Sequence, residues 1–407
     1  MVSAYLQESL AVAFNVMAVV LSPSSFFWAI TLVVGLQYYR MAKNKAEFFE
    51  VPRDRVWPMV LVATGWGIVA GIAGSLLMDF LNISIGFTGL EYLWPVALVL
   101  MMLNPRFLCF AYAGGLVSLS YLIFGWPQVN PSQMMALVGV LHLMESFLIL
   151  VSGHLGATPT YMKLDSGEVV GAFTLQRLWP IPLSILILSR PIILDKFTME
   201  LSFTEPYFPF LLVIAALGYS DIALSRNPKA KSSSSFKYLG LYSIILLAIS
   251  IFSAHYPPLV WIAVLFGPLG HELVIKLGQQ EEFGGRPIYR APDRGVMVLD
   301  VVDKSAADVG GIRSEDVILT VDGIAVDNKQ VLEQMLRDRV GAEAVEMVIG
   351  RNGSFSRSIR LRLGDQGAGI IPVPDLNEGY YVELLKENWI LRWVRRSWGR
   401  LWGRKSA

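Results

Sequence analysis

The chain has 407 residues, of which 54% are hydrophobic and only 16% are charged, and its formal net charge is +1. Soluble domains carry about 25% charged residues, so the composition excludes an ordinary soluble enzyme, and the balanced charge gives no indication of a nucleic-acid partner. The single cysteine, Cys109, excludes an intramolecular disulfide and any Cys-rich metal site. Apolar runs recur through residues 1–275, and mixed sequence follows. We therefore expect a multi-span membrane domain followed by a soluble domain.

The apolar runs predict about eight to ten helical segments within residues 1–275. The clearest is 56–78, which contains no charged residue and is long enough to cross a bilayer, for which about 20 apolar residues suffice. Its Gly67 and Gly71 form a G-x-x-x-G pair, which permits close packing of helices. The N-terminal run at 5–20 is a span, half of a helical hairpin or an interfacial helix. The remaining candidates are 25–39, 92–103, 107–124, 133–152, 178–189, 207–224, 238–254 and 257–275.

The distribution of lysine and arginine predicts how these segments are oriented. The connections at 40–55 and 226–237 are rich in both residues, whereas those at 79–90, 125–131 and 255–258 contain neither. Cytoplasmic loops of membrane proteins carry an excess of Lys and Arg, so we expect the basic connections and the C-terminal domain in the cytoplasm. Residues 161–176 alternate around Asp165-Ser166-Gly167 and predict a β-hairpin at the cytoplasmic interface.

The soluble part divides into a linker at 276–289, a domain at 290–363, a connector at 364–385 and a tail at 386–405. Strands are expected around "VMVLDVV" and "VILTVDGIAV", an amphipathic helix at "NKQVLEQMLRDRV", and a final hairpin around Asn352-Gly353. This order, with "RGVMVLDVVDKSAADVGGIRSEDVILTVDG", resembles a bacterial, circularly permuted PDZ domain. The fold class we expect is a polytopic α-helical membrane domain, a cytoplasmic α+β PDZ domain and an amphipathic C-terminal helix.

The PDZ resemblance implies a peptide-binding groove. It places the loop that binds a peptide carboxylate at 294–297, and Gly295 there can adopt a positive φ. A bound peptide would add as a strand beside 296–302 and pack on the helix at 328–337. An alternative is that the domain is a structural module that binds no peptide. The implied groove residues are Arg294, Gly295, Val296, Met297, Val298, Val331 and Met335.

The tail combines basic and aromatic residues with helical spacing. At 100° per residue its apolar side chains share one arc and its arginines the opposite arc, as in helices that lie on anionic membrane surfaces. Contact with nucleic acid, or packing on the spans, are the alternatives, and four tryptophans favour the lipid bilayer. The residues expected at the membrane surface are Trp389, Arg392, Trp393, Arg396, Trp398 and Trp402.

Among the ionisable residues within the apolar runs, His142, Glu145, His271 and Glu272 form the polar group that we expect inside the membrane domain. Such residues are costly in a membrane and suggest a function. A buried hydrogen-bonded cluster joining two helices, a proton or ion pathway, and a metal site using His142, Glu145 and His271 are all open. We favour the hydrogen-bonded cluster and expect neither a bound metal nor another cofactor.

The sequence "HELVI" at 271–275 is similar to the start of the zinc-protease motif H-E-x-x-H. A site-2-type intramembrane protease would also combine spans with a PDZ domain. That chemistry needs a second histidine four residues after the first, and Ile275 occupies the position. A metal-dependent membrane enzyme, or a regulator of one, is therefore the alternative function rather than the expected one.

The stretches "LHLMESFLILVSG", "GAFTLQRLWPIPL" and "FGPLGHELVI", with the C-terminal domain, resemble the MinJ-like family of polytopic membrane PDZ proteins in the bacterial Min system of cell division. The resemblance implies an adaptor without enzymatic activity, located in the cell membrane and enriched at septa and poles. It also implies protein partners similar to DivIVA and MinD, which the adaptor would connect so that division is placed correctly. No catalytic residue follows from it.

Overall fold

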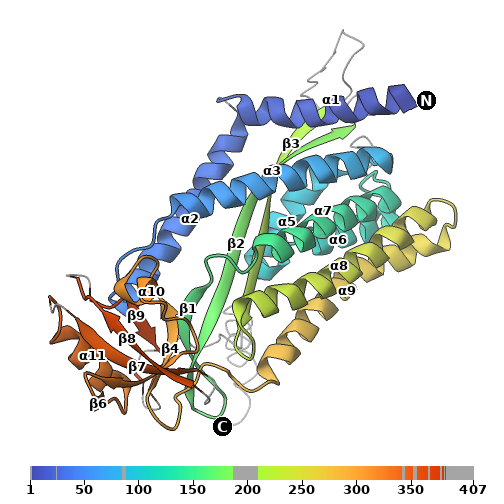
Figure 1. The fold of residues 1–407 in the computed structure, drawn as a ribbon. Coiled ribbons are helices and arrows are strands. Elements are labelled where there is room, and N and C mark those ends of the chain that lie inside the picture. The colour runs from blue at the N-terminus through green and yellow to red at the C-terminus, as the bar shows by residue number, and fades with distance from the viewer. Residues whose placement is uncertain are drawn as a thin grey trace, which may run out of the picture.

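The computed structural model describes residues 2–23, 25–84, 89–186, 210–341, 344–351, 355–364, 367–375, 378–379 and 381. Helices surround a long β-hairpin in the membrane domain, and a smaller domain of strands and short helices lies at one end of it (Figure 1). The tail expected at 386–405 lies outside the described residues.

Three helices form the N-terminal part. Helices α1 (Val2–Leu21) and α2 (Phe26–Phe49) meet at a bend of 63°. Helix α3 (Trp57–Phe80) begins with a proline in its first turn, a position that needs no N–H donor. Both α2 and α3 pack on the long β-hairpin.

The next two helices, α5 and α6, form a short helical hairpin, and α7 after them is a long, largely buried helix. Helix α5 (Leu90–Leu103), the 3₁₀ turn η1 (Pro105–Leu108) and helix α6 (Phe110–Phe124) follow one another closely. At 1.5 Å per residue, α5 and α6 rise only about 21 to 23 Å, short of a hydrocarbon core of about 30 Å. Helix α7 (Pro131–Ser152) is capped by Asn130, which accepts a hydrogen bond from the N–H of Gln133 (3.2 Å).

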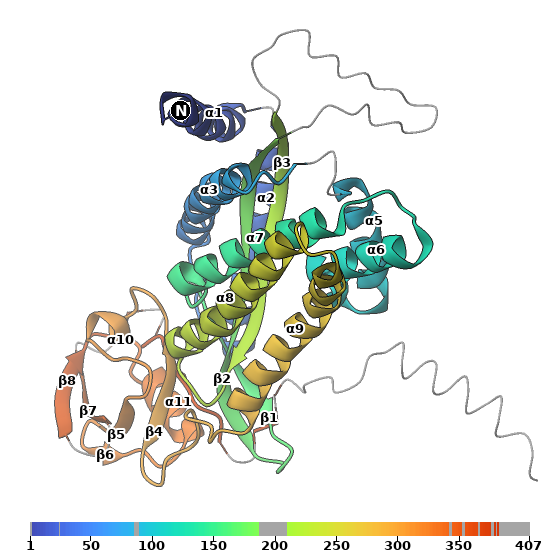
Figure 2. The same ribbon diagram turned by 90° about the vertical axis from the view of Figure 1, so that its right-hand side faces the viewer.

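The last two membrane helices pack against each other and against α7. Helix α8 (Pro228–Ser253) is capped by Asn227, which accepts from the N–H of Ala230 (2.9 Å). Helix α9 (Pro258–Phe283) returns toward the C-terminal domain. In Figure 2, α3 lies to the left of the long pair of strands, whereas α8 crosses in front of them.

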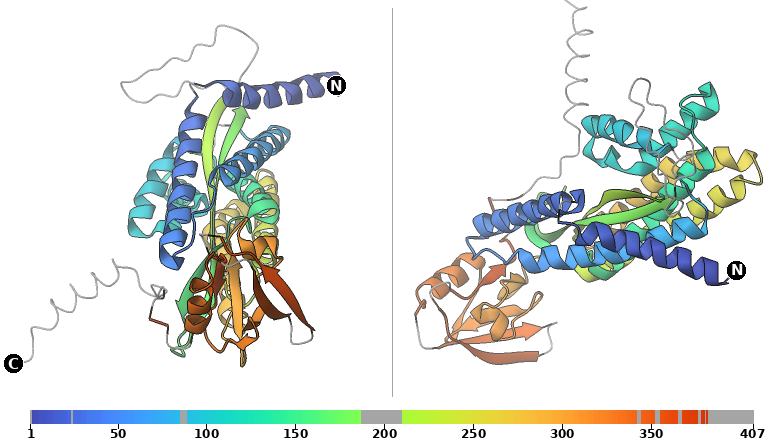
Figure 3. Two further views of the ribbon diagram at one scale, coloured as in Figure 1. Left: turned by 60° about the vertical axis from the view of Figure 1, so that its left-hand side comes forward. Right: turned by 90° about the horizontal axis from the view of Figure 1, so that it is seen from above.

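A three-stranded antiparallel sheet with order β1-β2-β3 runs through the domain. Strand β1 (Thr158–Lys163) pairs with the start of β2 (Val169–Leu186), and the turn between them contains Gly167 with φ 90°. The hairpin predicted at 161–176 is therefore confirmed. Strand β3 (Phe210–Ala223) pairs along β2 from Phe173↔Ala223 to Leu186↔Phe210. The pair rises from the C-terminal domain alongside α2 and α3 (Figure 3).

The predicted spans at 178–189 and 207–224 are wrong, because their described residues form β2 and β3 rather than helices. Strands buried on both faces read as continuous apolar runs, which periodicity alone does not separate from helices. Such strands are compatible with membrane depth only where protein satisfies their backbone. Along β2, the hydroxyl of Tyr38 donates to the carbonyl of Leu178 (3.1 Å), and Pro180 and Pro182 have no N–H to satisfy.

The glycines of α3 pack on this strand. A Cβ at Gly67 would meet the carbonyl oxygen of Pro180, and one at Gly71 would meet that of Pro182. One turn further, Ser75 donates to the carbonyl of Gly71 (2.6 Å) and accepts from the N–H of Ser184 (2.9 Å). The G-x-x-x-G pair thus permits close approach, but to a strand rather than to another helix.

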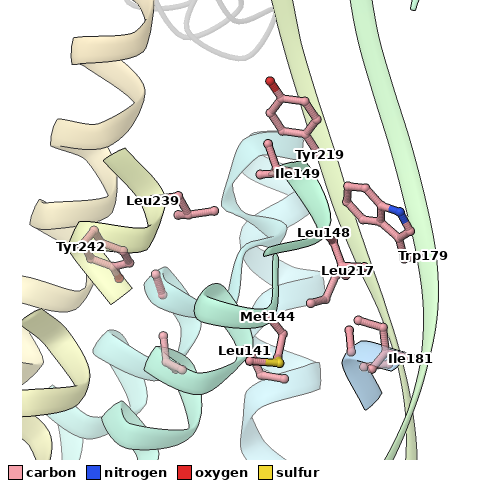
Figure 4. Packing of buried hydrophobic residues seen from close by; sticks show 14 of the residues in the cluster. Leu141, Met144, Leu148, Ile149, Trp179, Ile181, Leu217, Tyr219, Leu239 and Tyr242 are labelled. Carbon is pink, nitrogen blue, oxygen red and sulfur yellow. The ribbon is translucent and has the colours of Figure 1, made fainter. Parts of the chain in front are cut away.

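The apolar core lies between the strand pair β2–β3 and helices α7 and α8 (Figure 4). From α7, Leu148 and Ile149 face Trp179 of β2 and Leu217 of β3, all nearly inaccessible to solvent. The indole N–H of Trp179 donates to the hydroxyl of Ser152 (3.0 Å), so the buried ring leaves no unpaired donor.

Four helices of the described residues are long and apolar enough to cross a membrane, namely α3, α7, α8 and α9, and the bent pair α1–α2 would make a fifth. This supports a membrane protein. It is fewer than the eight to ten segments expected, because two runs are strands and α5 and α6 are short.

The C-terminal domain contains a sheet of order β8-β7-β5-β4-β9 with β6 beside β5. Its own core gathers Val296, Val298, Ile318, Leu332 and Ile349. The elements are β4 (Val296–Val301), α10 (Ala306–Val309), β5 (Val317–Val321), β6 (Ile324–Ala325), α11 (Lys329–Arg337), β7 (Val345–Arg351), β8 (Phe355–Leu361) and β9 (Ile370–Pro372).

Candidate functional site

The residues expected to form the peptide groove occupy different environments. Val296 and Val298 are buried in the domain's own core, whereas Met297 packs on the apolar cluster of the membrane domain. Arg294 is exposed before β4. On α11, Val331 and Met335 are partly buried, and Met335 packs against the domain core.

Gly295 has a structural reason to be glycine. Its φ is 78°, and a Cβ there would lie 2.5 Å from the carbonyl oxygen of Ile318 and 2.8 Å from a methyl group of Val317. The residue therefore permits β4 to enter its pairing with β5. The expected role, allowing a ligand to approach, is not needed to explain it.

Both edges of β4 carry partners within this chain. Strand β5 pairs with Val296 and Met297, and β9 pairs with 298–301 on the other edge. The N–H of Val302 donates to Gly369 (2.9 Å), and the N–H of Val373 donates to Met297 (2.9 Å). The edge where a peptide strand was expected is thus occupied by residues 369–373, which run antiparallel to β4.

The chain after β9 continues to the start of α11. Asp375 accepts a hydrogen bond from the N–H of Lys329 (3.2 Å), and Lys329 forms an ion pair with Glu378 (2.6 Å). Asn328 caps the helix by accepting from the N–H of Val331 (2.9 Å). Residues 369–375 and Glu378 therefore reach from the edge of β4 to the N-terminus of α11.

The opposite face of β4 packs the C-terminal domain against the membrane domain. Leu299 is fully buried and belongs to the apolar cluster of the membrane domain, together with Tyr289 and Ile371. The N–H of Gly171 donates to the carbonyl of Tyr289 (2.7 Å), and the hydroxyl of Tyr161 donates to that of Pro372 (2.8 Å). One apolar cluster thus extends through both domains.

A shared lysine reinforces this interface. Lys45, near the end of α2, lies 3.0 Å from carboxylate oxygens of both Asp54 and Asp300. Burial raises the pKa of Asp300 above its ordinary value, an effect that the charge of Lys45 opposes. Beside this contact, an open cleft of about 1180 Å³ separates the two domains, with Arg53, Arg55, Lys304 and Arg360 among its lining residues.

The intramembrane residues divide into two groups. His142 and His271 come together with Cys109, whose Sγ lies 3.0 Å from Nε2 of His142 and 3.5 Å from Nε2 of His271. Glu272 points elsewhere, to an ion pair with Arg106 and a hydrogen bond from the hydroxyl of Tyr112 (2.9 Å). Glu145 lies one turn after His142 but is not one of the three convergent ligands.

Sequence reasoning missed Cys109, which it treated as one residue of an apolar run. The local signal was the break at Asn104-Pro105, which ends α5 and places Cys109 as the cap of α6. The hydrophobic pattern gave no indication that this turn meets α7 and α9 near their middles.

The chain is similar to a curated protein named cell division topological determinant MinJ, from Bacillus subtilis. The two are 24% identical over 355 residues, which cover 81% of this chain and 86% of the relative. No family model matches the chain. Residues 1–275 make up only about two thirds of the sequence. An alignment that covers 81% of the chain therefore extends beyond the membrane domain into the C-terminal region.

Proposed function

We propose that the protein is a membrane-anchored adaptor in the placement of the division site, and that its C-terminal domain is a cytoplasmic PDZ domain that recruits regulators of cell division. The observation that carries the proposal is the similarity to a division topological determinant across both domains. Candidate partners are proteins similar to DivIVA and MinD. The enzyme alternative is less supported, because Ile275 replaces the second histidine of the protease motif.

The relative positions of the basic connections support a cytoplasmic C-terminal domain. Lys45, in the basic stretch 40–55 that begins within the last turns of α2, contacts Asp300 of that domain. Arg226, from the second basic connection, pairs with Glu281 at the end of α9 (2.9 Å), and Ile288 donates to Leu224 (3.1 Å) nearby. Both Lys/Arg-rich connections thus lie at the end of the membrane domain that bears the C-terminal domain, as expected if this end faces the cytoplasm.

Orientation can be tested with reporter fusions. A reporter active only in the cytoplasm should be active when fused after Ala407 and inactive when fused after Gln128, in the connection between α6 and α7. Periplasmic-type reporters should give the opposite pattern. Activity of the Ala407 fusion on the outer side would contradict the cytoplasmic assignment, and with it the adaptor proposal.

The implied groove also suggests how a partner binds. An incoming strand would replace β9 on the edge of β4 and contact α11, as in other cases of strand addition. Val331 offers the more selective test, because Met335 packs against the domain core whereas Val331 is not part of that packing.

We expect Val331→Glu to reduce partner recruitment at least about tenfold, because an unpaired charge is costly to bury in an apolar contact. Gln334→Glu adds the same charge at an exposed position of the same helix and should leave recruitment unchanged. The measurement is the amount of DivIVA-like and MinD-like protein that co-purifies with the full chain from membranes. Normal recruitment by a folded Val331→Glu protein would exclude this groove as the adaptor surface.

A further inference from the structure

Three helices bring nitrogen and sulfur ligand atoms together inside the membrane domain. Cys109 precedes α6, His142 lies in the middle of α7, and His271 lies in the middle of α9. Their Sγ and ring nitrogen atoms all lie within 4.8 Å of one another. His142 is 2% exposed, and the other two side chains are partly buried. The residues are far apart in sequence, so helix packing alone creates the group.

The partners of the two rings leave the inward nitrogens free to bind. Nδ1 of His142 lies 2.8 Å from the carbonyl of Val138, which only accepts, so Nδ1 carries the proton and Nε2 has a lone pair. Nδ1 of His271 faces the hydroxyl of Tyr112 (3.5 Å), whose own proton is directed to Glu272. Histidines that bind metals are held in this way, with the outer N–H on a carbonyl or a polar oxygen.

Hydrogen bonding within the group does not satisfy these atoms. With both protons on Nδ1, two acceptor nitrogens face one thiol, which has a single weak proton to donate. One lone pair then has no donor in a buried, apolar environment, where an unsatisfied polar atom costs free energy. A metal ion accepts all three lone pairs at once.

Charge balance also favours a cation. Glu145 lies three residues after His142 and therefore on the same face of α7. No hydrogen bond or ion pair joins its carboxylate to another residue of the described chain. A divalent ion bound by one thiolate and two neutral imidazoles keeps one positive charge, and the Glu145 carboxylate would neutralise it.

We propose that Cys109, His142 and His271 bind one zinc ion, with Sγ of Cys109 and Nε2 of each histidine as ligands. Thiolate and imidazole select zinc or another thiophilic transition metal over magnesium and calcium. The thiol loses its proton to the solvent as the metal binds. The ion would fasten the short α5–α6 hairpin to α7 and α9. This assignment replaces the expectation from the sequence that no metal is bound.

The test uses the full-length chain, purified in detergent without chelators. Elemental analysis should find about one zinc per chain, and cobalt substitution should give absorption from thiolate-to-cobalt charge transfer. Cys109→Ser, His142→Gln and His271→Gln should each reduce bound zinc at least tenfold. His154→Gln, two residues after the end of α7, is the matched control and should keep its zinc.

A second measurement keeps the proposal testable if a variant fails to fold. Cys109 is the single cysteine of the chain, so maleimide labelling of the unaltered protein reports on this thiol alone. Zinc added to chelator-treated protein should slow labelling at least tenfold, whereas magnesium should not. Zinc-independent labelling of folded protein would overturn the proposal, as would wild-type protein that takes up neither zinc nor cobalt.

Discussion

Gly71→Val should prevent correct assembly of the membrane domain. The new Cβ would lie 2.2 Å from the Pro182 carbonyl oxygen, so α3 would have to move away from β2. That movement also breaks the contact in which Ser75 accepts from the N–H of Ser184 (2.9 Å). Because the substitution adds a steric clash and leaves a buried N–H without an acceptor, we expect the free energy of unfolding to fall by more than about 4 kcal/mol, as for the most destabilising core substitutions. The measurement is the yield of monodisperse protein in detergent and its thermal midpoint.

Gly65→Val is the matched control for this prediction. It adds the same side chain to the same helix, but a Cβ at Gly65 meets no atom within 4 Å, and the position is exposed. Its effect should stay within about 0.5 kcal/mol, as for other surface substitutions. If Gly71→Val protein melted like Gly65→Val protein, the close approach of α3 to β2 would not exist in the molecule.

The largest error in the sequence-based prediction was to assign helices to two segments of the membrane domain that are strands. Runs 178–189 and 207–224 are apolar over a helical length, yet their described parts are β2 and β3. Strand β2 is buried on both faces over most of its length, so the period-2 alternation that reveals a half-exposed strand is weak in it. Pro180 and Pro182 could have indicated a strand. Two prolines at alternate positions are unfavourable inside a helix, but in a strand both fall on the same edge, where no N–H donor is then needed.

The hairpin at 161–176 could be predicted because its turn chemistry is local. Asp165-Ser166-Gly167 lies between alternating segments, and Gly167 adopts the positive φ that such turns need. The strands, the helix at 329–337 and the final hairpin of the C-terminal domain were predictable for the same reason. The pairing of β9 with β4 was not, because it joins segments some 70 residues apart and follows no turn signal.

The candidate metal group shows the same limit. The sequence placed His142 and His271 inside apolar runs, and it suggested that they meet. It also grouped Glu272 with them, although adjacent residues point to different sides of a helix, and Glu272 pairs with Arg106 instead. Cys109 entered only through the packing of the short α5–α6 hairpin against α7 and α9.

The contact between the two domains has a consequence for recruitment. Because Leu299 of β4 is fully buried in the apolar cluster that extends through both domains, a partner of the proposed adaptor would have to use the remaining surfaces of the C-terminal domain. These include the edge occupied by β9 and the side of α11. The orientation of the proposed partner-binding surface relative to the membrane would therefore depend on the contact between the two domains.

Lys45→Glu should release the C-terminal domain from this docked state. The substitution places a third carboxylate beside Asp54 and Asp300, each now 3.0 Å from the lysine ammonium. Removing one partner of a fully buried ion pair costs about 3 to 5 kcal/mol. This group is only partly buried, with Lys45 10% and both aspartates 24% exposed, so we expect a smaller loss, to which the reversed charge adds repulsion. Lys45 belongs to α2, so the core of the C-terminal domain itself is unaltered. The expected result is undocking of a folded domain.

Hydrogen exchange can measure this undocking. The amide of Gly171 donates to Tyr289 (2.7 Å) and that of Ile288 donates to Leu224 (3.1 Å), so both bonds join the linker to the membrane domain. Both amides should exchange at least tenfold faster in Lys45→Glu, whereas amides of β7 should be unchanged. Lys43→Glu, on the same helix with a largely exposed side chain, should exchange like the unaltered protein. Adding Asp300→Lys to Lys45→Glu restores opposite charges and should restore slow exchange; fast exchange in this double variant would show that the charge contact does not hold the domains together.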